Sequence, residues 1–156
     1  MAKILNVSSK NSLKAAIDLG IAMQLTNIAR DVIEDSKMNR SYINSNFESI
    51  IKTLKLADSF YESSFKSIKE IPLSSRFGIL VARRVYREIG NKVLNKKNMD
   101  NYKNSGKIYV SNFGKINQTL LSIFDLIKLV FTKQGEHLRK DEHSIINEQI
   151  NLNERI

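Results

Sequence analysis

One amide and two carboxylate side chains recur at helical spacing near the beginning of the sequence. Asn27, Asp31 and Asp35 are four residues apart, so on an α-helix they lie on successive turns of one face, and Gln24 lies one turn earlier. Mg²⁺ prefers such oxygen ligands, commonly taking one or two carboxylates while it keeps positions for substrate phosphates. The spacing therefore fits a magnesium site with Asn27, Asp31 and Asp35 as ligands and Gln24 in support.

A simpler interpretation of the same stretch is a solvated acidic patch on an ordinary helix. Arg30 and Glu34 would then form an ion pair between successive turns, worth about 0.2 to 0.5 kcal/mol. Asp31 and Asp35, however, repel each other by roughly 3 kcal/mol at an effective dielectric constant of about 20. Fold stability alone would not select that repulsion, but the residues by themselves leave both interpretations open.

The helix that carries these side chains is expected to run from Asn11 or Ser12, either of which can cap its first turn, to Asp35. Most of its other positions are apolar, so we expect the helix to be buried on most sides. Buried carboxylates are costly unless a cation compensates them, which again points to a metal ion.

Three further helices are expected from apolar residues at three- and four-residue spacing. The range 47–70, ended by Pro72, has a stripe formed by Ile50, Leu54, Ala57, Tyr61, Phe65 and Ile68. The next helix begins near Ser74 or Ser75, and its face consists of Phe77, Val81, Val85, Ile89 and Val93. The last helix, 115–132, is expected to bury Ile116, Leu120, Phe124, Ile127 and Phe131. The ranges 36–46 and 95–114 are expected to be polar loops, with a short extended piece at 108–110.

The composition favours an all-α helical bundle. The 156 residues include one proline and six glycines, whereas helix-forming residues fill the periodic stretches. There is no cysteine, which excludes disulfides and thiolate metal sites. The size predicts a single domain at 1–133, followed at 134–156 by a polar tail that is frayed or disordered.

The net charge of +9 suggests an anionic partner. Because lysine and arginine are spread along the chain without a basic block, we expect no nucleic-acid binding. Residues 1–10 contain no apolar block of signal-peptide length, and no later run approaches the roughly 20 apolar residues of a membrane span. The expected location is the cytoplasm, either free or with peripheral contact to a membrane.

The first helix contains the string LGIAMQLTNIARDVIED at 19–35, which together with Arg40 and Tyr42 closely resembles the second aspartate-rich motif of the squalene and phytoene synthase family. The resemblance implies that Asn27, Asp31 and Asp35 bind Mg²⁺ and that the two aspartates are catalytic. The substrate-binding residues that it implies are Gln24, Arg30, Arg40, Tyr42 and Tyr86.

Weaker similarity to this family continues to about residue 115. The range 57–72 resembles a family helix that ends in proline, 76–90 resembles the helix after it, and 110–115 resembles the last motif. Tyr86, in the second of these ranges, is implied to line the prenyl cavity, and a core tyrosine is the ordinary alternative. Asn39 stands where the family usually has glycine, which leaves the geometry of the loop open.

The resemblance implies a partial isoprenoid (terpenoid) synthase fold that condenses two geranylgeranyl diphosphates head to head into phytoene, in carotenoid biosynthesis. The alternatives are a squalene or dehydrosqualene synthase acting on farnesyl diphosphate, and a non-catalytic basic helical binding protein. The first aspartate-rich motif of the family has no counterpart here, so the chain resembles the carboxyl-terminal half of a synthase. We expect it to need the missing amino-terminal half and to be inactive alone.

Overall fold

The computed structural model describes residues 10–133, and the regular secondary structure within them is entirely helical. The elements are α1 (Lys10–Arg30), α2 (Val32–Lys37), α3 (Phe47–Phe65), the 3₁₀ helix η1 (Lys66–Glu70), α4 (Leu73–Leu94), α5 (Met99–Asn104) and α6 (Asn112–Phe131). The all-α prediction is therefore confirmed. The tail predicted at 134–156 lies outside the described residues, and the domain limits stay a prediction.

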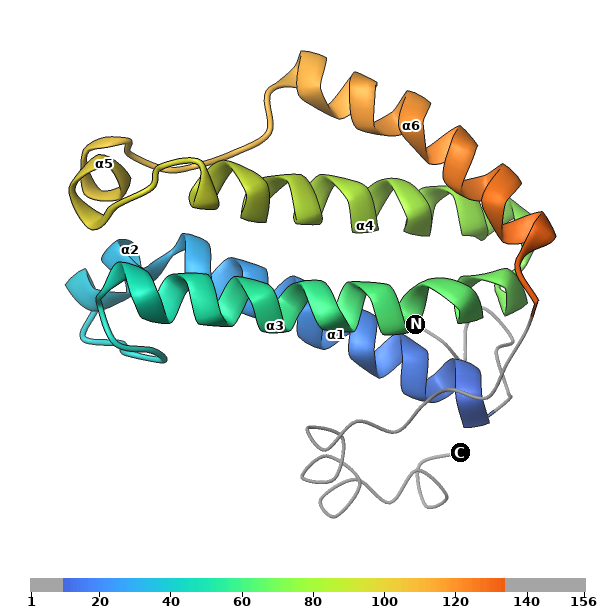
Figure 1. Cartoon of the computed structure of the whole chain (residues 1–156), viewed down its shortest axis with the longest axis horizontal. Coiled ribbons are helices and arrows are strands. Elements are labelled where there is room, and N and C mark those ends of the chain that lie inside the picture. Colours follow the sequence, from blue (N-terminus) through green and yellow to red (C-terminus); the bar gives the residue numbers. More distant parts are fainter. Residues whose placement is uncertain (1–9, 134–156) are drawn as a thin grey trace.

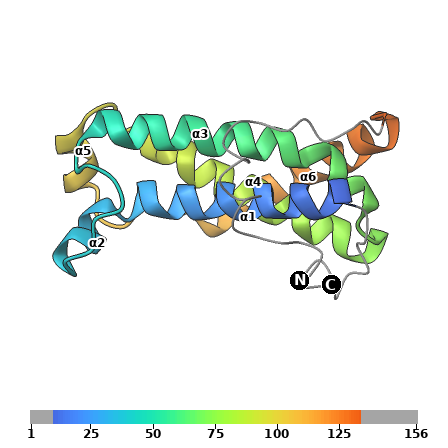
Figure 2. The same cartoon turned by 90° about the horizontal axis from the view of Figure 1, so that it is seen from below.

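The four long helices form a bundle with two short helices at one end. α1 packs against both α3 and α4, and α4 packs against α6 on another side. In Figure 1, α6 forms the upper edge, α4 lies below it, and α3 lies below α4 with α1 crossing behind it. Figures 1 and 2 both place α2 and α5 at the same end of the bundle. Within the described residues, no helix is long and apolar enough to cross a membrane.

Polar residues cap three of the helices at their amino-terminal ends. Asn46 precedes α3, Asn98 precedes α5 and Ser111 precedes α6; each side-chain oxygen accepts a hydrogen bond from the amide three residues later, at 2.8, 2.8 and 3.2 Å. Each cap satisfies an amide that has no partner within its helix. Pro72 separates η1 from α4, so the helix predicted at 47–70 ends where expected, although its last turn is 3₁₀.

The stripe predicted for residues 47–70 lies at the centre of the core. All six of its side chains are at most 7% exposed, which confirms this prediction. Facing them on α1 are Ala22 and Ala29, both fully buried, whose small side chains let the two helices approach closely. Gly90 has the same role between α4 and α3, because a Cβ atom there would lie 3.2 Å from Leu54 Cδ2.

The segment between α4 and α6 differs from the polar loop that was expected. Residues 99–104 form the helix α5, which begins after the capping side chain of Asn98. Ile108 and Val110 are buried, but they do not belong to a strand. The sequence of α5 shows no apolar periodicity, because Tyr102 is the only one of its side chains that is buried.

The orientation of α6 contradicts the prediction for residues 115–132. The five side chains expected to be buried do share one face, but that face is exposed: Ile116, Leu120, Phe124, Ile127 and Phe131 are all more than half accessible. The buried face is the opposite one, with Ser122, Asp125 and Leu129. The physical reason is that α6 turns a carboxylate toward arginines of α4, and no described element covers its other side.

Two matched substitutions test this orientation. Leu54→Ala removes a side chain that is 5% exposed, so we expect the free energy of unfolding to fall by about 2 to 5 kcal/mol. Leu120→Ala changes a side chain that is 57% exposed, and we expect an effect within about 0.5 kcal/mol. Urea unfolding of the full chain measures both. A loss for Leu120→Ala as large as that for Leu54→Ala would show that α6 is turned the other way.

Candidate metal and diphosphate site

Asp31 interrupts the predicted helix but preserves the four-residue hydrogen-bond step. Its φ of −105° and ψ of 13° place it between α1 and α2, so the single helix predicted at 11–35 is in fact two. The hydrogen bonds from Asp31 N to Asn27 O (2.9 Å) and from Asp35 N to Asp31 O (2.8 Å) nevertheless preserve the four-residue step. Asn27, Asp31 and Asp35 thus remain one turn apart across the break.

These residues, together with Gln24, form what we call the acidic stripe, and it lies on the open side of α1. The buried side of α1 carries Ala15, Leu19, Ala22 and Ala29, which meet α3 and α4. Gln24 is exposed and the three ligand candidates are half-buried. The expectation that this helix is buried on most sides was therefore wrong, because both of its long neighbours pack against the same side.

Asp31 is paired with the arginine that precedes it. Arg30 donates from Nε to Oδ1 at 2.7 Å and from a terminal nitrogen to Oδ2 at 2.5 Å. This hydrogen bond raises the pKa of the Arg30 guanidinium. The predicted pair of Arg30 with Glu34 is thus replaced by a bidentate pair between neighbouring residues. The guanidinium compensates a carboxylate that a metal ion would otherwise have to neutralise.

The loop after α2 folds back over Asp35. Arg40 N donates to Asp35 O at 2.9 Å, and Asn39 adopts a φ of 56°. Asparagine tolerates this left-handed conformation better than other residues with a side chain, which explains how it can stand where the family usually has glycine. Asp35, Arg40 and Tyr42 line one small cavity of about 10 Å³. The structure thus brings these three predicted residues together.

Tyr86 is a residue of α4 and packs toward α1 and α3. It is partly buried and packs against the core cluster that includes Leu19, Phe60 and Tyr61. Its phenol makes a small contribution to the raised pKa of Arg30, after the larger effect of the hydrogen bond to Asp31. This position fits the core interpretation of Tyr86, and its contact with substrate stays a prediction.

Tyr102 is a residue at this site that sequence reasoning missed. Its hydroxyl donates to Arg30 O at 2.7 Å and lies 3.3 Å from Ala29 O, so α5 holds the last turn of α1 directly before Asp31. The side chain is 3% exposed. A usable signal was Asn98, a capping residue three positions ahead of the α5 residue Asn101, which marks a helix start in the polar segment.

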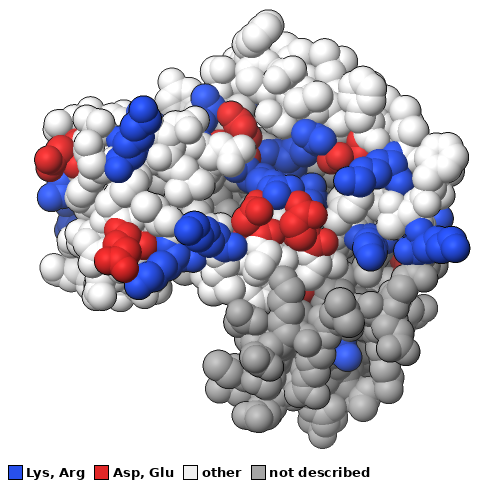
Figure 3. Space-filling view, in the orientation of Figure 1, with Lys and Arg blue, Asp and Glu red and all other residues white. Residues whose placement is uncertain are grey.

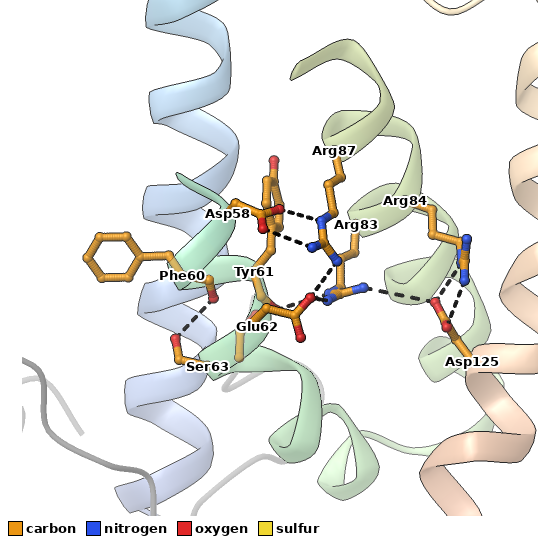
Figure 4. A network of polar contacts seen from close by, with 10 residues as sticks. Asp58, Phe60, Tyr61, Glu62, Ser63, Arg83, Arg84, Arg87 and Asp125 are labelled. Atoms are coloured by element: carbon orange, nitrogen blue, oxygen red, sulfur yellow. Dashed lines mark hydrogen bonds and ion pairs between the residues drawn. The ribbon is translucent and has the colours of Figure 1, made fainter. Parts of the chain in front are cut away.

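A second polar cluster lies away from the acidic stripe, between α3, α4 and α6. In Figure 3, acidic and basic side chains interleave across the middle of the face that it shows. Figure 4 shows how Arg83, Arg84 and Arg87 of α4 reach carboxylates on the two neighbouring helices. These charges line a cavity of about 290 Å³. Because each arginine has an acidic partner, the cluster joins helices and is no open anion site.

The chemistry of the acidic stripe is incomplete within the described residues. Across residues 10–133, no three Asp, Glu, His or Cys side chains are grouped so that they could hold a metal ion. The stripe offers two carboxylates and two amides, all oxygen donors suited to a hard cation. By its chemistry it fits one side of a magnesium and diphosphate site.

Comparison with known proteins places this motif in a family. The family model "Squalene/phytoene synthase" matches residues 1–46, which include the acidic stripe. The chain is thus similar to squalene/phytoene synthases over this motif. It is 33% identical over 115 residues to the 15-cis-phytoene synthase of Enterobacter agglomerans, a match that covers 60% of this chain and 39% of that protein. The 15-cis-phytoene synthase of Pantoea ananas is 33% identical over 114 residues, covering 60% and 37% of the two chains.

More distant relatives give the same picture. The phytoene synthase of Rhodobacter capsulatus is 29% identical over 119 residues, which cover 62% of this chain and 35% of that protein. The chain thus spans about two-fifths or less of the length of these relatives. No solved structure was found to match it.

The contact made by Tyr102 can be tested at neutral pH. Tyr102→Phe leaves the carbonyl oxygens of Ala29 and Arg30 without their buried donor, so we expect a loss of about 1 to 3 kcal/mol in the free energy of unfolding. Tyr109→Phe, which removes the same hydroxyl from a residue that is 71% exposed, is the control and should change stability little. Equal effects of the two substitutions in urea unfolding would argue against the α5 contact.

Alkaline pH should destabilise the fold. Burial raises the pKa values of Tyr61 and Tyr102 each to about 12, whereas the pKa of a tyrosine in an unfolded chain is about 10. Between these values the folded chain keeps protons that the unfolded chain releases. The free energy of unfolding therefore falls as pH rises through this window, by up to about 3 kcal/mol per tyrosine. Urea unfolding at about pH 9 and about pH 11.5 measures the loss, and Tyr102→Phe should reduce it.

Proposed function

We propose that this chain supplies one side of the active site of a phytoene synthase-type prenyltransferase. Such an enzyme condenses two geranylgeranyl diphosphates head to head with loss of diphosphate. The observation that carries the proposal is the acidic stripe, with Asn27, Asp31 and Asp35 on successive turns and the Arg40 loop folded over its end. The similarity to enzymes named phytoene synthase supports the choice of reaction.

The residues present fit magnesium by their chemistry. Asn27, Asp31 and Asp35 offer one amide and two carboxylate oxygens, and Mg²⁺ commonly accepts such a set while its other positions go to water and phosphate. When bound, Mg²⁺ would neutralise the diphosphate and favour its departure. We assign the ligand role to these three residues, with Asp31 and Asp35 as the catalytic pair.

Four further side chains are proposed to bind the substrate. Arg40 and Tyr42, both exposed in the loop beside Asp35, are placed to contact diphosphate oxygens. Arg30 already makes a bidentate pair with one carboxylate, and the same fork can bind phosphate oxygens when Asp31 turns to a cation. Gln24, one turn before Asn27 and exposed, supports the ligand set or a substrate oxygen.

The open position of the stripe explains why we propose that the chain does not turn over alone. An allylic cation reacts with water, so the site must be enclosed before a diphosphate leaves. Here α1 faces outward along the stripe, and the described residues provide no facing acidic helix. An amino-terminal half that carries the first aspartate-rich motif would supply both. Phytoene formed by the purified chain alone would contradict this part of the proposal.

Two alternatives are separated by experiment. Condensation of farnesyl diphosphate to squalene or dehydrosqualene would use the same residues. Comparing the affinity of the chain for farnesyl diphosphate and for geranylgeranyl diphosphate decides between these substrates. A non-catalytic basic protein would bind anions through its net charge of +9. Its affinity would fall steeply with salt and would not depend on Asp31.

Magnesium-dependent binding tests the proposal directly. Titration calorimetry of the full chain with geranylgeranyl diphosphate should show binding that requires Mg²⁺. Asp31→Ala should weaken it by about 10-fold or more, because it removes a proposed ligand. Asp100→Ala, at an exposed aspartate of α5, is the matched control and should bind like the unmodified chain. Equal binding by the two variants would exclude Asp31 as a ligand.

A further inference from the structure

The exposed side of α6 is an apolar surface as long as the helix. We call it the α6 stripe, and its members recur at three- and four-residue spacing: Phe113, Ile116, Leu120, Phe124, Ile127 and Phe131. Their exposures range from 51 to 82%. A helix of 20 residues is about 30 Å long. A continuous apolar face of this length is more typical of an interface than of a free surface.

The α6 stripe cannot turn inward, because the opposite face of α6 is fixed. Arg84 of α4 makes two hydrogen bonds to Asp125 of α6, at 2.6 and 2.8 Å, and Arg83 lies 3.9 Å from the same carboxylate (Figure 4). Asp125 and Leu129 are buried at this contact. Rotation of α6 would separate these charges within a largely enclosed site, which is costly.

The arginines of α4 also form ion pairs with α3. Arg87 pairs with Asp58 and with Glu62 of α3, and Glu62 also lies 3.5 Å from Arg83. Arg83, 4% exposed, donates to Tyr61 O at 3.1 Å and stacks over the Phe65 ring. Carboxylates on both neighbours therefore set the orientation of α4, and through Asp125 that of α6.

The surroundings of the stripe indicate what covers it. α6 is the outermost helix at one edge of the bundle, and the corresponding upper edge in Figure 3 is free of charged side chains. A charge-free face with helical spacing suits another helix. The matched relatives are more than twice as long as the region they share with this chain, so each carries further polypeptide that could pack there.

We propose that the α6 stripe is the docking surface for the amino-terminal part of the synthase, that is, for polypeptide equivalent to the region of the relatives outside the match. The choice of partner rests on the proposed function, whereas the existence of the interface does not. Apolar packing along α6 would hold the two parts together. The acidic stripe of α1 would then complement the first aspartate-rich motif, which the amino-terminal part carries.

The test joins the full 156-residue chain with the part of the Enterobacter agglomerans 15-cis-phytoene synthase that precedes the matched region. We expect a one-to-one complex by size-exclusion chromatography with light scattering after co-expression. Ile116→Asp and Phe124→Asp should each weaken it by roughly 30-fold or more, because a charge enters the centre of the interface. Asn104→Asp, at an exposed position of α5, adds the same charge elsewhere and should leave the complex intact.

Two further measurements separate the explanations. Circular dichroism should show unchanged helix content for the stripe variants, because both changed side chains are more than half exposed. Asp31→Ala should keep the complex and lose only magnesium-dependent binding of geranylgeranyl diphosphate, so the docking surface and the proposed function can fail independently.

Several results would overturn the inference. These are the absence of any complex, or a complex that the stripe variants leave unchanged. Self-association of the chain that Ile116→Asp abolishes would assign the stripe to a second copy. Binding to phosphatidylglycerol vesicles that the same substitution abolishes would assign it to a membrane surface. Either of the last two results also rejects the amino-terminal part as the occupant.

Discussion

The one-sided packing of α1 is the constraint on which the rest of the site depends. Alanines on one side of this helix let α3 and α4 approach closely, and both neighbours use that side. The other side is left for polar residues, which are buried only in part and so lose less hydration than they would in the core. Gln24, Asn27, Asp31 and Asp35 therefore owe their accessible position to small apolar residues that have no chemistry of their own.

The far end of α1 shows how short elements refine this arrangement. The helix stops at Arg30, and the hydroxyl of Tyr102 binds the carbonyl oxygen at that point. The chain resumes as α2 with the same four-residue step, and the loop that follows is turned back by the left-handed Asn39. The short helix α5 thus fixes the start of the segment that carries Asp31 and Asp35, and α2 continues it. With six residues each, α2 and α5 are too short to be stable as isolated helices and depend on packing against the rest of the fold.

Sequence periodicity located most elements but could not decide what lies opposite each face. It was right for residues 47–70, where the stripe from Ile50 to Ile68 meets α1 and α4 and is buried. Applied to α6, the same rule identified the apolar face correctly but predicted that it is buried, whereas it is exposed. Periodicity carries no information on whether a neighbouring element covers a face. On the buried face of α6, Asp125 is held by Arg84 and Arg83, which lie 41 and 42 positions earlier in the sequence.

The candidate site was predictable to a similar extent. Four-residue spacing and the family motif identified Asn27, Asp31 and Asp35, and the structure keeps them one turn apart. The break at Asp31 had no signal, since neither proline nor glycine occurs between Asn27 and Asp35. The pairing of Arg30 with its neighbour depends on that break, so spacing alone suggested Glu34 instead. Tyr102 was missed because its partners are backbone oxygens, which sequence patterns do not reveal.

The pair formed by Arg30 and Asp31 gives the protein an internal counter-ion. A carboxylate that already has a cation does not need a divalent ion in order to fold, so the scaffold can form first and be loaded afterwards. In the proposed enzyme, a magnesium ion held by Asp31 would have to compete with this tethered guanidinium for the carboxylate. Such competition would favour a weakly held ion that exchanges together with the diphosphate.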